Sequence, residues 1–197
     1  MKTLQITSSL FGNGGQSTQL ANQFIAARGG DVVVRDLAQD PVPHLDGARF
    51  GAFLSKPGER TPEQQAVLDY SDRLIGELRD AGTIVLGLPM YNFGIPSTLK
   101  AYFDHIARAG VTFKYTDKGA VGLLTGKKAY VFAARGGIYG DGNQSQYVRD
   151  FLGFLGITDV EFIYAEGLAI GPASKEAGLA KARQAIERMT QPELAAA

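Results

Sequence analysis

The chain has 197 residues, 45% of them hydrophobic and 20% charged, and its 20 basic and 20 acidic side chains give a formal net charge of +0. This length fits one well-buried domain, and a neutral chain has no global field to recruit nucleic acid or an anionic membrane. No cysteine and only two histidines occur, which excludes disulfides, thiolate-bound metals and cysteine nucleophiles. We therefore expect no bound metal, no nucleic-acid partner and no membrane partner.

The distribution of apolar residues bears on location and domain number. Residues 1–7 lack the long apolar stretch of a secretory signal peptide. No segment approaches the roughly 20 apolar residues that cross a bilayer as a helix. The chain also has no internal repeat, low-complexity segment or linker. We expect one cytoplasmic domain that covers residues 1–197.

The first part of the chain is predicted to contain two strands and two helices. A strand over residues 3–8 leads through a glycine-rich turn into a helix over 18–27, whose apolar residues share one face. The β-branched run at 31–35 predicts a second strand. Residues 37–60 are rich in Pro, Gly and Asp and are expected to be irregular. A helix with a suitable N-cap and a proline in its first turn is predicted over 61–80.

The remaining residues continue the alternation of strands and helices. Residues 111–115 are predicted to be extended, ahead of a polar turn. The further core strands are expected at 83–88, 128–134 and 160–164, and the further helices at 97–108, 144–155 and 175–189. Such an alternation predicts a parallel sheet with helices on both faces. Five strands fit the flavodoxin-like order 2-1-3-4-5 of a three-layer α/β/α fold, although the sequence alone does not determine the order.

The glycine-rich turn at residues 12–18 has the chemistry of a phosphate site. A helix N-terminus offers unpaired N–H groups and a positive dipole end, and glycine lets the backbone approach an anion closely. The turn lacks the lysine of a P-loop, and Ser17 stands where a dinucleotide fingerprint has its third glycine. Asp36, however, lies near the distance expected of a ribose-binding acid. An NAD-binding Rossmann site and a purely structural turn therefore stay open.

A second turn, residues 89–93 with the sequence Pro-Met-Tyr-Asn-Phe, directly follows the apolar strand at 83–88. Its aromatic rings and amide suit a flat ligand rich in heteroatoms, and ligands of open α/β sheets bind at the carboxyl ends of strands. A third turn with two consecutive glycines, at 134–139, offers backbone N–H groups. In the order 2-1-3-4-5 the three turns converge. Phosphate donors, aromatic faces and backbone amides together predict FMN.

Several segments carry a resemblance to one family. They are Ser8-Ser9 with Gln16-Ser17, Arg35-Asp36-Leu37, residues 89–93, Ala107-Arg108-Ala109-Gly110-Val111-Thr112-Phe113, Arg135-Gly136-Gly137 and Phe154-Leu155-Gly156-Ile157. With these motifs the chain resembles, nearly end to end, the FMN-dependent NADH azoreductases, also called NADH:quinone oxidoreductases, of the flavodoxin-like fold. The turn at 89–93 and the segment at 108–113 are the most specific of them.

The resemblance implies contacts to FMN from three groups of residues. They are Ser9, Gly15, Gln16 and Ser17 for the phosphate, Met90, Tyr91, Asn92 and Phe93 for the ring and ribityl chain, and Ala134, Arg135, Gly136 and Gly137 for the rest of the ring. Many relatives have Ser at the position of Gly15 and Ser or Thr at that of Ala134, so both positions offer only backbone groups here. Tyr139 stands where some relatives carry His.

The resemblance also implies a reaction in two steps through one site. NADH or NADPH gives hydride to the flavin and leaves, and a quinone or an azo compound then takes it up. The flavin carries this chemistry, so we expect no catalytic side chain. The N–H groups around Gly136 and Gly137 are suited to stabilise negative charge on the reduced ring, and Asn92 helps to hold the ring in place.

Further residues are expected to line the site or an interface. Phe113, Tyr115, Tyr139 and Phe162 are the candidates for the substrate side, with core packing as the alternative for Phe113 and Tyr115 and as the favoured role of Phe162. The family is typically homodimeric, with each site completed across the interface. Residues 37–60 and 103–116 are the expected interface segments.

Two other functions are compatible with the same patterns. A flavodoxin-like carrier would pass single electrons without binding a substrate, but such carriers are usually strongly acidic, whereas this chain is neutral. A flavin-free, NAD-binding Rossmann enzyme would use the glycine-rich turn and Asp36 instead.

Overall fold

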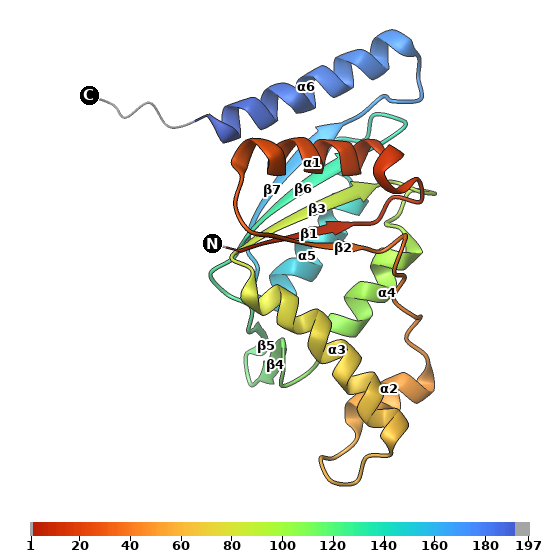
Figure 1. Cartoon of the computed structure of the whole chain (residues 1–197), viewed down its shortest axis with the longest axis vertical. Helices are drawn as coiled ribbons and strands as arrows, with labels where there is room; N and C mark the ends of the chain where they lie inside the picture. Colours follow the sequence, from red (N-terminus) through yellow and green to blue (C-terminus); the bar gives the residue numbers. More distant parts are fainter. Residues whose placement is uncertain (1, 192–197) are drawn as a thin grey trace, which may run out of the picture.

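The computed structural model describes residues 2–191, so residue 1 and residues 192–197 of the predicted domain lie outside the described residues. Five parallel strands form the central sheet (Figure 1). They are β1 (Thr3–Thr7), β2 (Val32–Asp36), β3 (Thr83–Pro89), β6 (Lys128–Ala134) and β7 (Asp159–Ala165), in the order β2-β1-β3-β6-β7. The predicted order 2-1-3-4-5 of the core strands is confirmed.

Helices cover both faces of the sheet, as the alternating pattern predicts (Figure 1). The first face carries α1 (Gln16–Arg28) and α6 (Pro172–Thr190), whose apolar residues pack with Val85, Phe132 and Ile163. The opposite face carries α3 (Pro62–Asp80), α4 (Ser97–Ile106) and α5 (Asn143–Leu155) over the larger core. The three-layer α/β/α architecture is confirmed.

Local signals explain where these helices begin and end. At the start of α3 the hydroxyl of Thr61 accepts from Gln64 N, and the Gln64 side chain accepts from Thr61 N, which completes a capping box. Pro62 follows at the first helical position, where its missing N–H costs nothing. At the end of α5, Gly156 has a φ of 99°, a left-handed conformation that terminates a helix.

The prediction that residues 37–60 are irregular is wrong for one segment, because Gly47–Leu54 forms helix α2. The two glycines of this segment lower its intrinsic helix propensity, so the sequence alone does not indicate a helix there. The carboxylate of Asp46 caps it by accepting from Arg49 N at 2.8 Å. Packing against α3 supplies the remaining stabilisation, and α2 with the first part of α3 projects away from the sheet (Figure 1).

A small antiparallel hairpin lies apart from the main sheet. It consists of β4 (Phe113–Thr116), where an extended segment is predicted, and β5 (Gly119–Gly122), which has no predicted counterpart. The hairpin is anchored on the last turn of α5. There the backbones approach so closely that a Cβ on Gly122 would lie 2.0 Å from Gly156 N. Contacts between residues far apart in sequence thus stabilise these short strands.

Two glycine substitutions are expected to change stability in opposite directions. Gly122→Ala should lower the free energy of unfolding by about 1–3 kcal/mol, because the backbone of Gly156 would have to move. Gly76→Ala, in the interior of α3 with open space around its Cα, should raise it by about 0.5–1 kcal/mol. Urea denaturation of both variants checks this, and a stable Gly122→Ala would contradict the close packing.

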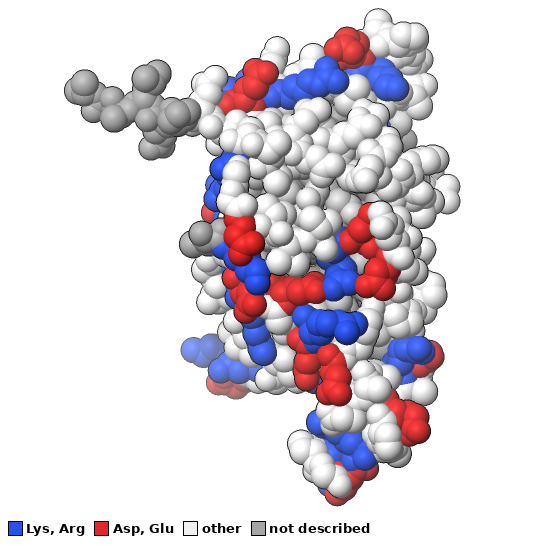
Figure 2. Space-filling model, viewed as in Figure 1, with Lys and Arg blue, Asp and Glu red and all other residues white. Residues whose placement is uncertain are grey.

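Acidic and basic side chains are intermixed along α3 and α6 on the face that Figure 2 shows. Some of them tie elements together, as where the Arg35 guanidinium of β2 pairs with Glu77 of α3 and Asp40. The pKa of Arg35 is raised, chiefly by its hydrogen bond to Glu77. Within residues 2–191, no helix combines the length and the apolar character needed to cross a membrane.

Candidate functional site

The three turns singled out in the sequence lie together at the carboxyl ends of β1, β3 and β6. Their strands are neighbours in the sheet, which places the turns side by side. Met90 N donates to Ala134 O at 3.1 Å and joins the aromatic turn to the glycine-pair turn. Leu10 N donates to the Tyr91 hydroxyl at 3.2 Å and joins it to the glycine-rich turn. The predicted convergence is confirmed.

The glycine-rich turn leads into the first turn of α1, which contains hydrogen-bond donors without a partner among the described residues. Gly15 is the N-cap and offers no side chain to the free N–H groups of the first turn. The hydroxyls of Ser17 and Thr18 are buried, and neither has a hydrogen-bond partner among residues 2–191. Buried hydroxyls normally find a partner, so two orphans beside a helix N-terminus indicate a missing anionic acceptor. A phosphate group fits this donor set.

Gly15 makes room for the side chain of Ser9. A Cβ on Gly15 would lie only 2.0 Å from Ser9 Oγ, so no larger residue fits while that rotamer is kept. Ser9 Oγ in turn accepts from Phe11 N at 3.2 Å and lies 3.4 Å from the Tyr91 hydroxyl. The hydroxyl beside the backbone of Gly15 therefore belongs to Ser9, because residue 15 itself has no side chain.

The aromatic turn has an uncommon backbone conformation. Tyr91 and Gly94 exchange backbone hydrogen bonds of 3.2 and 3.0 Å, and the two residues between them have positive φ, 49° at Asn92 and 67° at Phe93. Such a two-residue turn prefers Asn and Gly, and a phenylalanine is strained in it. The Phe93 side chain is nevertheless 75% exposed. Backbone strain that carries an aromatic ring into solvent is typical of a ligand site.

Arg135 lies beneath the glycine-pair turn instead of pointing into the site. Its side chain is fully buried, and the guanidinium donates to Gln144 Oε1 at 3.1 Å and Ser145 Oγ at 2.6 Å. It also donates to Gly140 O at 2.5 Å and to Glu166 Oε1 at 3.2 Å. All these acceptors belong to the protein, so the predicted ring contact of Arg135 does not come from its side chain.

The glycine-pair turn keeps two backbone donors free. Glu166 Oε1 accepts from Tyr139 N at 2.8 Å and Gly140 N at 2.9 Å, which fixes the end of the turn. The N–H groups of Gly136 and Gly137 make no hydrogen bond to any described residue. The Tyr139 ring also lies so near that a Cβ on Gly137 would be 2.9 Å from it. The turn thus offers two adjacent backbone donors, with the Tyr139 ring packed beside Gly137.

A second layer of polar groups supports Arg135. The Tyr164 hydroxyl donates to Asp141 Oδ1 at 2.7 Å and lies 3.0 Å from Ser145 Oγ. The Tyr164 hydrogen bond lowers the pKa of Asp141, while burial raises the pKa of Tyr164 itself. The Arg135 guanidinium lies 4.9 Å from the centre of the Tyr164 ring. Near neutral pH Asp141 is therefore ionised and Tyr164 is protonated.

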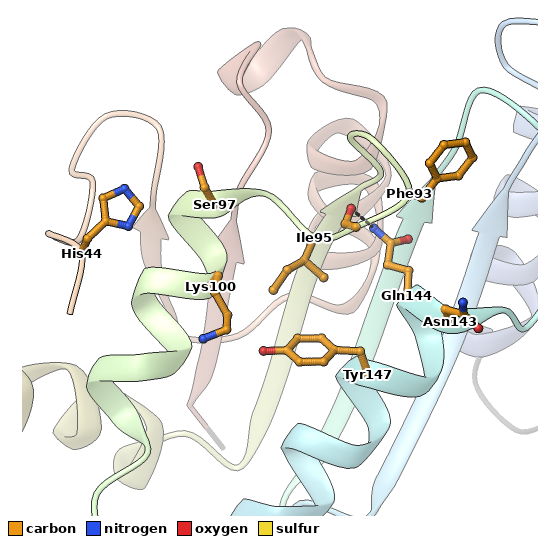
Figure 3. A pocket seen from close by; sticks show the side chains of 9 residues that line it. His44, Phe93, Ile95, Ser97, Lys100, Asn143, Gln144 and Tyr147 are labelled. Atoms are coloured by element: carbon orange, nitrogen blue, oxygen red, sulfur yellow. Dashed lines mark hydrogen bonds between the residues drawn. The ribbon is translucent and has the colours of Figure 1, made fainter. Parts of the chain in front are cut away.

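Two hollows border the aromatic turn. The larger, of about 480 Å³, is lined by His44, Phe93, Gly94, Ile95, Ser97, Lys100, Asn143, Gln144 and Tyr147. Figure 3 shows Ile95, Lys100 and Tyr147 reaching into it from three elements. The smaller, of about 240 Å³, is lined by Met90, Phe93, Tyr139, Gly142, Asn143 and Gln144. Phe93, Asn143 and Gln144 line both, so the turn and the start of α5 form the wall between them.

The residues predicted for the substrate side are not all in one place. Tyr139 lies beside Phe93, with ring centres 6.1 Å apart. The hairpin with Phe113 and Tyr115 packs on the last turn of α5, where Leu124 N, just after β5, donates to Leu155 O at 2.8 Å. The first turn of α5, in contrast, contacts the site. The 13 residues of α5 separate the two by about 20 Å. Within one chain, the hairpin therefore does not reach the site.

The other aromatic candidates differ in exposure. Phe113 is buried against Phe154, with ring centres 4.3 Å apart, while Tyr115 is 74% exposed. Phe162 lies in the middle of the edge strand β7, with the Arg149 guanidinium 4.3 Å from the centre of its ring. A lining role for these three residues stays a prediction that needs a second copy of the chain.

One oxygen of the Asp36 carboxylate, the candidate ribose-binding acid, is engaged within the protein. Its Oδ1 accepts from Ala38 N at 2.9 Å and Gln39 N at 3.4 Å, which closes the turn after β2. The carboxylate thus has a structural role, and the argument for a dinucleotide at this turn is weakened.

Two residues that hold the turns, Gln144 and Glu166, are not among the site residues predicted from the sequence. Gln144 Nε2 donates to Pro89 O at 2.9 Å and Gly94 O at 3.0 Å. Glu166 carried a signal, because it directly follows the last strand at the carboxyl edge. Gln144 carried none, because it is the first residue of a predicted helix, and its partners other than Arg135 lie 50 and 55 residues away along the chain.

Comparison with known proteins agrees with this geometry. A model of the flavodoxin-like fold matches residues 1–189. An FMN-dependent NADH:quinone oxidoreductase of Cellvibrio japonicus (strain Ueda107) is 56% identical over 193 residues, which cover 94% of this chain and 96% of that protein. FMN-dependent NADH:quinone oxidoreductase 6 of Burkholderia lata is 56% identical over 191 residues, which cover 93% and 96%.

Solved structures of azoreductases are similar over the whole fold. The azoreductase from Bacillus anthracis str. Sterne has a TM-score of 0.88 and 27% identity, covering 96% of this chain and 98% of that one. An FMN-dependent NADH-azoreductase from Bacillus anthracis str. Ames Ancestor, in complex with FMN, has a TM-score of 0.82 and 29% identity, covering 97% and 100%. The resemblance inferred from the motifs is confirmed, and the chain belongs to the FMN-dependent NADH:quinone oxidoreductases of the flavodoxin-like fold.

Proposed function

We propose that this chain binds FMN at the three turns and transfers two electrons from NADH or NADPH to quinones and aromatic azo compounds in two separate half-reactions. The observation that carries the proposal is the pair of buried, unpartnered hydroxyls at the start of α1, beside an exposed aromatic turn. When bound, FMN supplies the hydride chemistry, and the protein supplies orientation and electrostatics. The names of the relatives support the donor and the two acceptor classes.

Each turn has its own role in this proposal. Ser9, Gly15, Gln16 and Ser17 hold the phosphate, together with the α1 N-terminus. Met90, Tyr91, Asn92 and Phe93 seat the ring, with the backbone of Ala134. The N–H groups of Gly136 and Gly137 have no partner among the described residues, which suits them to stabilise negative charge on the reduced ring. Arg135 contributes by holding the glycine-pair turn from below.

We further propose a cytoplasmic homodimer of single-domain chains, with each site completed by its partner. Phe50 and Leu54 on α2 are 51% and 70% exposed, and Tyr115 on the hairpin is 74% exposed. Exposed apolar side chains of this size mark surfaces that associate. A second copy would bring Phe113, Tyr115 and Phe162 to the open side of the flavin, beside Tyr139.

The colour of the purified protein tests the cofactor. A yellow preparation with absorbance near ~450 nm supports bound FMN, because the chromophore belongs to the flavin. A colourless protein that binds NADH but no added FMN would instead indicate the flavin-free Rossmann enzyme. Anaerobic stopped-flow mixing with NADH then tests the reaction. Rapid bleaching supports the oxidoreductase, whereas a yellow protein that neither NADH nor NADPH bleaches would indicate the electron carrier.

Asn92→Ala is expected to weaken FMN binding about three- to tenfold, the value of one or two hydrogen bonds, and to slow reduction by NADH while the fold stays intact. Flavin fluorescence titration and circular dichroism measure the two effects. Asn92→Gly is the matched control, because glycine also removes the amide but adopts the φ of 49° without strain. Unchanged binding and reduction in both variants would remove the Asn92 amide from the site.

A further inference from the structure

Gln144 holds both ends of the aromatic turn. Its Nε2 donates to Pro89 O at 2.9 Å and to Gly94 O at 3.0 Å, the carbonyl groups on either side of residues 90–93. Its Oε1 accepts from Arg135 Nε at 3.1 Å. Because the guanidinium of Arg135 can only donate, the Gln144 oxygen must face it, and both amide hydrogens then face the turn. The orientation of this buried carboxamide is therefore determined.

Apart from the hydrogen bond from Met90 N to Ala134 O, few contacts with the described residues support the turn from inside the protein. The two hollows border it on both sides, and Phe93 is largely exposed. Figure 3 shows the Gln144 side chain reaching the turn from α5, with its hydrogen bond to Gly94. The other side-chain tether joins the Tyr91 hydroxyl to the loop after β1. A segment with few packed neighbours depends on its hydrogen bonds for its conformation.

The turn also needs restraint because its backbone is strained. Asn92 and Phe93 have φ values of 49° and 67°, a region that residues with a Cβ leave unless their surroundings hold them there. Gln144 fixes the carbonyl groups that flank these two residues. Without it, we expect the turn to sample other conformations, and Asn92 and Phe93 to lose their fixed place.

We propose that Gln144 is a positioning residue for the flavin, which acts by holding the aromatic turn in the conformation that seats the FMN ring. The inference rests on the proposed function, since it needs FMN at this turn. Gln144 itself contacts the protein through all its polar atoms, so its effect reaches FMN through Asn92 and Phe93. Arg135 takes part by selecting the orientation of the Gln144 amide.

Gln144→Glu tests this with a substitution of the same shape. A carboxylate keeps an acceptor for Arg135 but has no hydrogen for Pro89 O or Gly94 O. The expected result is an FMN dissociation constant at least tenfold higher. FMN that saturates the variant should also show a changed visible spectrum and midpoint potential, which a purely structural role would not move. Gln144→Met, which removes the donors without adding charge, should give the same changes and serves if the first variant does not fold.

Gln146→Glu is the matched control, because it places the same charge in the same turn of α5 on an exposed side chain. Among residues 2–191 the Gln146 side chain hydrogen-bonds only to Asp150 of its own helix, so its variant should bind FMN within about twofold of the wild type. If folded Gln144 variants match Gln146→Glu in FMN affinity, spectrum and potential, the positioning role is overturned and the proposed function stands. If the wild type itself binds no FMN, the proposed function fails and the inference fails with it.

Discussion

Replacing Arg135 by Met is expected to lower the free energy of unfolding by about 3–5 kcal/mol, the range seen when one partner of a buried ion pair is removed. The guanidinium has no exposed surface, and Glu166 is only 16% exposed, so the remaining carboxylate would lack its nearest cation. Gln144 Oε1 and Ser145 Oγ would lose their donor as well. Because these groups hold two turns of the site, FMN binding should weaken with stability.

Chemical denaturation of the apo-protein and a flavin titration measure both effects. Arg149→Met is the matched control, since that guanidinium is 35% exposed and pairs with the exposed Asp141 at 3.3 Å. Arg149 also donates to Val160 O at 3.2 Å, but an exposed pair contributes only about 1 kcal/mol or less, so the control should lose clearly less stability than Arg135→Met. Arg135→Lys should be intermediate, because an ammonium group keeps the charge but not the planar fork of donors. Equal losses in Arg135→Met and Arg149→Met would contradict the supporting role of Arg135.

Ser17→Ala is expected to separate cofactor binding from stability. The Ser17 hydroxyl is buried without a protein partner, so its removal should leave the apo-protein as stable as before, or more stable by up to about 1 kcal/mol. FMN binding should weaken about 10- to 100-fold, because a hydrogen bond to a charged phosphate contributes about 1.5–3 kcal/mol. Thermal melting of the apo-protein and flavin fluorescence titration give the two values.

Ser71→Ala should show the opposite pattern and is the control. Its hydroxyl is also fully buried, but it donates to His105 O at 2.6 Å in the core between α3 and α4. Loss of this hydrogen bond should lower the free energy of unfolding by about 1 kcal/mol and leave the FMN dissociation constant unchanged. If Ser17→Ala destabilises the apo-protein and binds FMN normally, Ser17 is a structural residue and the phosphate site lies elsewhere.

Elements with a strong periodic or capping signal were predictable. The buried run at 83–88 and the alternation around it indicated a parallel sheet, because only that arrangement covers both faces of such strands. Helix α2 and strand β5 were not predictable, since glycine-containing segments have weak propensities and depend on packing against α3 and α5. Local sequence propensities therefore determine whether a segment forms a helix or a strand only where those propensities are strong.

The sequence by itself determined the fold class, the three ligand turns and the family, because each depends on residue types that follow one another along the chain. Only the tertiary structure decided how those turns are held. Arg135 lies beneath its turn, Gln144 reaches Pro89 and Gly94, and the hairpin with Tyr115 lies at the far end of α5. These placements depend on side-chain directions and on contacts between distant segments, which the strand order constrains but local patterns do not contain.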